Sequence, residues 1–191
     1  MNATILDGFP AKDHFAAELL PKLQQELASA GFECRVLAPR DLKIAPCNGC
    51  FKCWVKTPGE CVTDDDGRLI ARTIAQSDLM VLYTPVTFGG YSSLLKRGLD
   101  RFIPNISPFF TQIKGETHHI PRYKKYPRLF ALGVQEREDA EAEETFRFLV
   151  ERNSRNMYDP DPTVGFLRRM EYMDANLLAL HGLVQRAGGG R

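Results

Sequence analysis

The sequence lacks several features that would direct the protein to particular partners. No apolar run reaches the roughly 18 residues that a membrane-spanning helix needs. The net charge is only +1, so no strong field draws the chain onto nucleic acid or an anionic membrane. The chain begins directly with the apolar run 3–6, without the charged and apolar regions of a signal peptide. We therefore expect no membrane and no nucleic acid as partner.

Cysteine is scarce and unevenly placed. The chain holds five cysteines, an odd number, and four of them fall within residues 47–61. A disulfide framework needs paired cysteines distributed over the chain, so this arrangement fits a reducing compartment better. The expected location is the cytoplasm.

Apolar segments of strand and helix length alternate along the 191 residues, which suffice for one well-buried core. The continuous apolar run 79–83 suits a central strand buried on both faces. The expected strands are residues 3–6, 33–37, 79–83, 129–134 and 163–167, and the expected helices are residues 14–30, 69–75, 93–101, 138–152 and 170–187. This alternation predicts a single doubly wound α/β domain, residues 1–191, with ligands at the carboxyl ends of its strands.

The pattern lapses over residues 102–127, where prolines interrupt an aromatic segment. A structureless loop of this length inside a compact domain is uncommon and usually functional. We interpret the segment as a lid or as an excursion that faces a second subunit. His118 and His119 lie within it and could ligate a metal or donate a proton, although solvated side chains are the simpler interpretation.

The densest cluster of reactive side chains is the cysteine run. Cys47, Cys50, Cys53 and Cys61 are spaced C-x2-C-x2-C-x7-C. Cysteines at every third residue of a tight loop can direct several sulfurs at one inorganic centre. Zinc fits less well, because all-cysteine zinc sites usually combine two separated pairs. A redox pair of Cys47 and Cys50, or a set of unmetallated structural thiols, are the other interpretations.

A glycine-rich loop, residues 84–91, follows the expected central strand. Five motifs occur in order from the cysteine run onward: Cys-x2-Cys-x2-Cys, Pro58-Gly59-x-Cys61, Asp65-Asp66, Thr84-Pro85-Val86 and Leu95-Lys96-x2-Leu99-Asp100-Arg101. With these motifs the chain resembles the NADPH-dependent FMN reductase family and, within it, the iron–sulfur flavoproteins. The likeness covers about residues 4–149.

The resemblance implies a flavodoxin-like fold, with five parallel strands in the order 2-1-3-4-5. It implies an FMN held by the first and third loops, and NAD(P)H as a transient electron donor. It also implies homodimers or homotetramers, and it assigns the four cysteines of the run to a 4Fe–4S cluster. No G-x-G-x-x-G fingerprint is present, which fits transient nicotinamide binding over the flavin.

The first loop carries the FMN phosphate in this family, and here it departs from the family pattern. The residues that flank the phosphate by resemblance are Gly8, Phe9, Pro10, Lys12 and His14. Phe9 replaces a serine, Ala11 an arginine and Ala16 a later hydroxyl residue. A helix N-terminus alone can bind phosphate, but charge-assisted donors worth roughly 1.5–3 kcal/mol each are absent.

The third loop keeps the family pattern better. The residues that contact the isoalloxazine ring by resemblance are Pro85, Val86, Thr87, Phe88, Gly89, Gly90 and Ser92. Glycines let backbone amides approach a flat ring closely. Thr87 replaces the usual tyrosine, and Phe88 or Tyr91 could supply the lost stacking surface.

Two functions follow from these observations. The first is an enzyme, an FMN-dependent NAD(P)H oxidoreductase that reduces a small acceptor such as a quinone, free flavin or an iron–sulfur partner. No side chain is needed as a catalytic nucleophile, because the cofactor carries the redox chemistry. The alternative is a flavodoxin-fold binding or electron-relay protein that has lost its catalytic flavin. The replacements that support it are Phe9, Ala11, Ala16 and Thr87.

Overall fold

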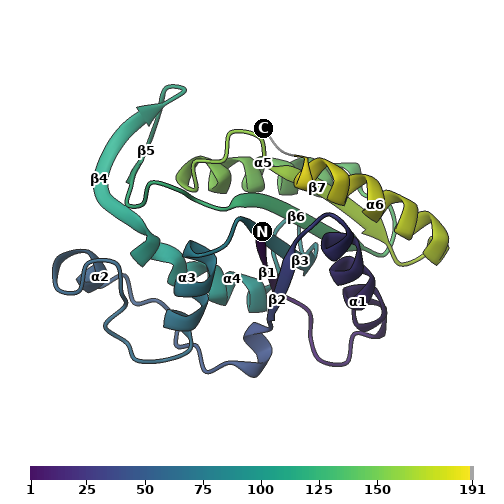
Figure 1. Cartoon of the computed structure of the whole chain (residues 1–191), viewed down its shortest axis with the longest axis horizontal. Coiled ribbons are helices and arrows are strands. Elements are labelled where there is room, and N and C mark those ends of the chain that lie inside the picture. The colour runs from purple at the N-terminus through teal and green to yellow at the C-terminus, as the bar shows by residue number, and fades with distance from the viewer. Residues whose placement is uncertain (190–191) are drawn as a thin grey trace.

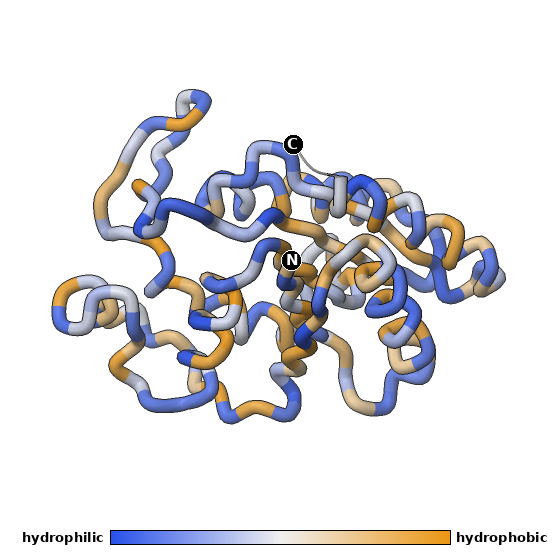
Figure 2. Tube along the Cα trace, viewed as in Figure 1, coloured by the Kyte–Doolittle hydropathy of each residue, from blue (hydrophilic) through white to orange (hydrophobic). Residues whose placement is uncertain are grey.

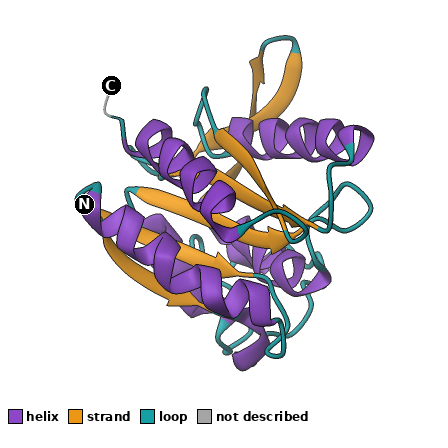
Figure 3. Cartoon of the chain, turned by 90° about the vertical axis from the view of Figure 1, so that its right-hand side faces the viewer, coloured by secondary structure: helices purple, strands orange, loops and turns teal. Residues whose placement is uncertain are grey.

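The computed structural model describes residues 1–189, and Gly190 and Arg191 lie outside the described residues. Five strands form one parallel sheet, and helices cover both of its faces (Figures 1 and 3). In chain order the elements are β1 (Asn2–Asp7), α1 (His14–Ser29), β2 (Glu33–Leu37), η1 (Pro39–Asp41), α2 (Lys52–Val55), α3 (Gly67–Ala75), β3 (Leu79–Pro85), α4 (Ser93–Leu99), η2 (Asp100–Asn105), β4 (Ile106–Ile113), β5 (Glu116–Pro121), β6 (Arg128–Gln135), α5 (Ala140–Asn156), β7 (Thr163–Arg168) and α6 (Met173–Gly188). The predicted α/β architecture with a five-stranded parallel sheet is confirmed.

The order of the sheet is β2-β1-β3-β6-β7. Numbered along the whole chain, this order differs from the predicted 2-1-3-4-5, because β4 and β5 come between the third and fourth strands of the sheet and form a separate two-stranded sheet. Among the strands of the large sheet alone, the first lies between the second and the third, and the fourth and fifth follow in turn. All neighbouring strands of the large sheet are parallel, so their carboxyl ends meet at one edge. The loops that follow β1, β3 and β6 therefore emerge side by side.

The core lies on both faces of β3, whose residues 79–84 are all buried. The run contains no charged side chain, as expected for a strand covered on both sides. One face packs against α1 and α6 through Leu19, Leu23, Leu27, Leu180, Leu183 and Val184. The other face packs against α3, α4 and α5 through Ile70, Ile74, Leu95, Phe146 and Val150. Figure 2 accordingly shows hydrophobic segments gathered along the central strands.

The expectation of a structureless segment at residues 102–127 is wrong. The segment begins with the end of η2 and continues as the antiparallel hairpin β4–β5, which projects from the body of the molecule (Figure 1). Lys114 and Gly115 form its turn with φ values of 50° and 79°. Two successive residues with positive φ are typical of the tight turns of hairpins. The prolines obscured this pattern, but Pro108 and Pro121 are tolerated because both strands are edge strands.

The helices of the described residues can be compared with the requirements for crossing a membrane. Within residues 1–189, none of the helices combines the length and hydrophobicity that crossing a bilayer requires.

Candidate functional site

The first loop, between β1 and α1, is closed by its own side chains. Phe9 is buried, and its ring centroid lies 4.5 Å from that of Tyr83. Asp7 accepts a hydrogen bond of 3.0 Å from the backbone N–H of Phe9. The guanidinium of Arg40 donates to Asp7 at 2.7 Å and to the carbonyl oxygen of Phe9 at 2.9 Å. Gly8 N–H donates to the carbonyl oxygen of Tyr83 at 2.8 Å. The backbone groups at the start of this loop therefore bond within the protein.

Asp13 caps the N-terminus of α1. Its carboxylate accepts from the backbone N–H of Ala16 at 3.0 Å, and Arg169 donates to it at 2.8 Å in a two-pronged pair. Burial of Asp13 disfavours its charge, but the hydrogen bonds from Arg169 and Ala16 outweigh this effect, and the pKa of Asp13 is lowered. The carboxylate is therefore ionised at neutral pH. An anion supplied by the chain itself occupies the positive end of the helix.

The third loop follows β3 and contacts the first loop directly. Thr87 and Gly90 exchange two backbone hydrogen bonds of 2.9 Å, and Gly89 at the tip of this turn has φ of 71°. Ser92 caps α4 by accepting from Leu95 N–H at 3.1 Å. The same hydroxyl donates to the carbonyl oxygen of Gly8 at 2.6 Å. One side chain thus starts a helix and joins two loops.

A cavity of about 730 Å³ opens between the third loop and the segment after β6. Its lining consists of Val86, Phe88, Gly89, Gln135, Glu136, Arg137, Glu138, Asp139, Glu141, Ala142 and Thr145. Gln135 is 7% exposed, and its side-chain Oε1 has no hydrogen-bond partner within residues 1–189. A buried acceptor without a partner is costly, so a small rotation of this side chain that gave Oε1 a donor in the cavity would be favourable. The cavity lies at the carboxyl edge of the sheet, where ligands of open α/β sheets bind.

The cysteine run forms a second cavity of about 290 Å³, which all four cysteines line together with Asp100 and Arg101. Cys47 and Cys50 are exposed, Cys53 is buried and Cys61 is half-buried. Burial, and then the neighbouring thiols of the run, raise the pKa of Cys53. Within residues 1–189, no three His, Cys, Asp or Glu side chains lie close enough together to hold a metal ion as they stand.

Arg101 holds the wall of the cysteine cavity in place. Its guanidinium is 2% exposed and donates two hydrogen bonds of 2.7 Å to the carboxylate of Asp65, and a third of 2.8 Å to the carbonyl oxygen of Ala45. Planar two-pronged pairing of this kind fixes both side chains. The pair anchors the segment that leads into the cysteine run to the start of η2.

The interpretation of His118 as a solvated residue is wrong. His118 is 7% exposed, and its ring nitrogens lie 3.2 Å from Asn156 Oδ1 and 3.1 Å from Glu116 Oε2. His119 lies 2.7 Å from the carbonyl oxygen of Ser107. The ring of His118 therefore joins the hairpin β4–β5 to α5, whereas the ring of His119 bonds within the hairpin. Their partners lie on β4, β5 and α5, outside both cavities described above.

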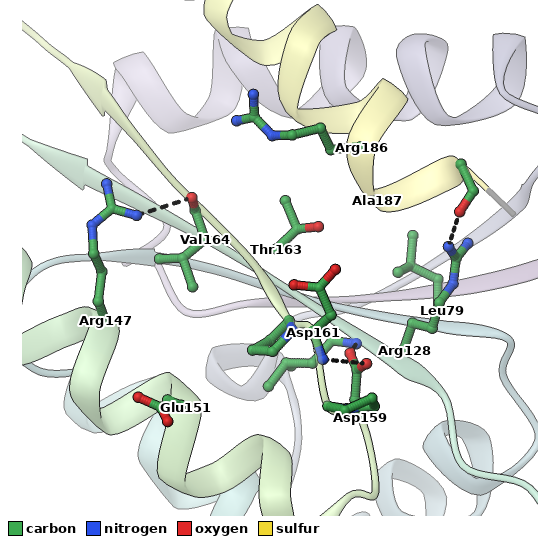
Figure 4. Close-up of a pocket in the computed structure, with 14 residues that line it drawn as sticks. Leu79, Arg128, Arg147, Glu151, Asp159, Asp161, Thr163, Val164, Arg186 and Ala187 are labelled. Atoms are coloured by element: carbon green, nitrogen blue, oxygen red, sulfur yellow. Dashed lines mark hydrogen bonds between the residues drawn. The ribbon is translucent and has the colours of Figure 1, made fainter. Parts of the chain in front are cut away.

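A third cavity, of about 720 Å³, lies at the opposite edge of the sheet (Figure 4). Leu79, Arg128 and Thr163 begin their strands, and all three line it. Arg128 donates to the carbonyl oxygen of Gly189, and Arg147 donates to that of Val164. This edge carries the amino ends of the strands, so we do not place the functional site there.

The predicted flavin-site residues thus separate into those at the third-loop cavity and those exposed at the start of α1. Gly8 and Ser92 are in contact, and Val86, Phe88 and Gly89 line the cavity beside them. Lys12 and His14 are exposed at the start of α1. Sequence reasoning missed Asp13 as an ion-pair partner, Arg169 and Gln135. The Asp13–Arg169 pair spans 156 positions of the chain, so no local pattern signals it.

Comparison of the sequence with known proteins identifies the family to which the chain is similar. Residues 1–115 match the family described as NADPH-dependent FMN reductase. An iron–sulfur flavoprotein of Archaeoglobus fulgidus is 34% identical over 104 residues, which cover 54% of this chain and 46% of that protein. An iron–sulfur flavoprotein of Methanocaldococcus jannaschii is 31% identical over 99 residues, covering 52% and 50%. The chain therefore spans about half the length of the curated relatives it matches.

Two solved structures share the fold over nearly the whole chain. An NAD(P)H:quinone oxidoreductase from Methanothermobacter marburgensis superposes with a TM-score of 0.68 at 16% identity, covering 98% of this chain and 95% of that one. An FMN-dependent NADH-azoreductase from Bacillus anthracis, in complex with FMN, gives a TM-score of 0.69 at 12% identity, covering 98% of each chain. Identities this low establish only the flavodoxin-like arrangement of strands and helices. Because the family match spans more than half of the sequence, this chain belongs to the NADPH-dependent FMN reductase family.

Proposed function

We propose that this chain, as one flavodoxin-like domain, is an FMN-dependent NAD(P)H oxidoreductase that reduces a small acceptor such as a quinone, free flavin or an iron–sulfur partner. Bound flavin would supply the hydride chemistry, and the protein would position the ring and the nicotinamide. The observation that carries the proposal is the cavity of about 730 Å³ at the carboxyl edge, with the buried Oε1 of Gln135 in its lining.

The chemistry of this lining fits a flavin ring. The pyrimidine edge of isoalloxazine offers an N–H donor, and rotation of the Gln135 side chain would turn toward it the buried Oε1, which has no partner within residues 1–189. Phe88 at the rim is fully exposed with φ of 50°, and exposed aromatic surface of this kind is suited to stacking on a flat ring. The close turn at Gly89 lets backbone approach the ring.

The test begins with protein purified without oxygen. We expect a flavin absorbance spectrum after addition of FMN, and NAD(P)H oxidation that depends on FMN and on an added quinone. Gln135→Leu should weaken FMN binding about tenfold, because it removes the ring acceptor. Gln185→Leu, an exposed position on α6, is the matched control and should leave binding unchanged. Absence of FMN binding in the unaltered protein would contradict the proposal.

We propose further that the cysteine run holds a 4Fe–4S cluster through Cys47, Cys50, Cys53 and Cys61. All four line one cavity, which is the arrangement a cluster with four thiolate ligands needs, and Arg101, paired with Asp65, forms part of its wall. Binding would require residues 46–51 to draw the exposed Cys47 and Cys50 toward the other two. Iron and sulfide counts on anaerobic protein test this: about four of each per chain supports it, whereas zinc, or neither element, contradicts it.

The second candidate function is a flavodoxin-fold binding or electron-relay protein without catalytic flavin. The observation in its favour is the first loop, which Phe9 and the Asp13–Arg169 pair close from within. A protein that stays colourless after exposure to FMN and that oxidises no NAD(P)H would favour this candidate over the first.

A further inference from the structure

The start of α1 already holds an anion. A helix N-terminus attracts negative charge because its first backbone N–H groups and its dipole point outward. Here the carboxylate of Asp13 accepts from Ala16 N–H at 3.0 Å, within the same chain. The side chain of Asp13 is only 12% exposed, so it is a built part of the loop. A second anion at this helix end would meet the first.

The cation at this position is also engaged. Arg169 reaches from the loop after β7, and its guanidinium pairs with both oxygens of Asp13. Its Nε lies 3.1 Å from Glu136 Oε1, so carboxylates face it on two sides. The guanidinium also lies over the rings of Phe9 and Phe15, with centroid distances of 5.8 and 5.2 Å. No unpaired positive charge is therefore offered by Arg169.

The space beside the helix end is filled as well. The ring of Phe9 is 1% exposed and packs against Tyr83. Its backbone N–H and carbonyl bond to Asp7 and Arg40. The cavity of about 730 Å³ beside the third loop has an acidic lining. It contains one cation, Arg137, and four carboxylates, those of Glu136, Glu138, Asp139 and Glu141. A phosphate dianion would meet these carboxylates and Asp13, against which the first loop sets the exposed side chains of Lys12 and His14.

We propose that this chain recognises a flavin by its ring alone. The Asp13–Arg169 pair takes the place that a flavin phosphate would occupy, so riboflavin binds at least as tightly as FMN. The inference rests on the proposed function, because it assigns a flavin ring to the cavity lined by Gln135. It narrows the ligand to flavins selected by the isoalloxazine ring, without a contribution from the 5′-phosphate.

The test titrates the flavin-free protein separately with riboflavin and with FMN and follows flavin fluorescence. We expect riboflavin to bind as tightly as FMN or more tightly. FMN bound roughly tenfold or more tightly than riboflavin would overturn the inference while leaving the proposed function intact. Binding of neither flavin would overturn both.

A substitution isolates the charge at the helix end. Asp13→Asn keeps a good N-cap but removes the negative charge and releases Arg169 from one partner. We expect this variant to bind FMN about tenfold more tightly than the unaltered protein does, with riboflavin affinity unchanged. Glu26→Gln makes the same charge change on the same helix, away from the loop, and should alter neither affinity. An unchanged ratio of the two affinities in Asp13→Asn contradicts the inference, and the ratio in the unaltered protein tests it independently should the variant fold poorly.

Discussion

Ser92 Oγ donates a hydrogen bond of 2.6 Å to the carbonyl oxygen of Gly8, across 84 positions of the chain. Ser92 Oγ also accepts from Leu95 N–H and so caps the start of α4. Because Ser92 is buried, water cannot replace either bond easily. The first and third loops are therefore held in register by one hydroxyl.

Removal of this hydroxyl should lower stability. Ser92→Ala leaves the carbonyl of Gly8 and the N–H of Leu95 without their partner, and we expect the free energy of unfolding to fall by about 1–3 kcal/mol. Urea denaturation measures the change. Ser93→Ala, the exposed neighbour that caps nothing, is the control. Equal stabilities of the two variants would show that the tie contributes nothing.

Neighbouring atoms leave no room for a side chain at Gly8. A Cβ at this position would lie 2.7 Å from Leu95 Cβ and 2.8 Å from Ser92 Oγ. We expect Gly8→Ala to cost about 1–3 kcal/mol, because the loop or α4 must shift. Gly182→Ala in α6 is the matched control, since beyond its chain neighbours and the backbone of its own helix turn nothing lies within 4 Å of the added Cβ, and helix propensity should raise stability by up to about 1 kcal/mol. Thermal unfolding shows whether each variant is more or less stable than the unaltered chain. A Gly8→Ala protein as stable as the unaltered chain would contradict the steric argument.

The Asp65–Arg101 pair should make stability depend on pH in acid. Burial disfavours the charge of Asp65, but hydrogen bonds from Arg101 and from the backbone N–H groups of Ala45 and Gly67 outweigh it, and its pKa is lowered. A lowered folded pKa means that the stabilisation is present above the unfolded pKa of about 3.9 and is lost as pH falls through the folded value.

Two variants test this dependence. Asp65→Asn should be less stable than the unaltered protein at neutral pH, and the difference should shrink as the pH falls below about 4. Asp64→Asn changes an 89% exposed carboxylate next door and should shift stability little at any pH. Urea midpoints measured from neutral to acid pH give both curves. A difference that stays constant over this range would exclude the titration of Asp65 as its source.

The cysteines of the run should react at different rates. The thiolate is the reacting form, and burial raises the pKa of both Cys53 and Cys34, whereas Cys47 and Cys50 are exposed. With iodoacetamide on metal-free protein we expect Cys47 and Cys50 to be modified first, as read by mass spectrometry of the peptides. In denaturant all sites should react alike, and early modification of Cys53 in the folded chain would be inconsistent with the structure.

Much of the fold could be predicted because its signals are local. The run 79–83 is apolar throughout, and the four-residue spacing of Leu19, Leu23 and Leu27 places one face of α1 on the sheet. The hairpin was missed because Pro108 and Pro121 interrupt the pattern that strands usually have. Lys114-Gly115, where the turn has positive φ, is the remaining local signal of the hairpin.

The site could be predicted only in part, because its decisive contacts are distant in sequence. The third loop, from Pro85 to Ser92, is a contiguous motif and can therefore be recognised in the sequence. Asp13 reads locally as a helix cap, which it is, but its partner Arg169 lies beyond β7. The missing acceptor partner of Gln135 is a property of burial and packing, so no single-sequence pattern reveals it.

The prolines of the hairpin have a consequence for how the molecule behaves at high concentration. A projecting pair of strands leaves one backbone edge on each side without a neighbouring strand within residues 1–189, and Phe109 and Phe110 stand exposed on it. Such an edge is a template for cross-β growth. Pro108 and Pro121 carry no amide N–H, so at these two positions the hairpin cannot donate a backbone hydrogen bond to a further strand.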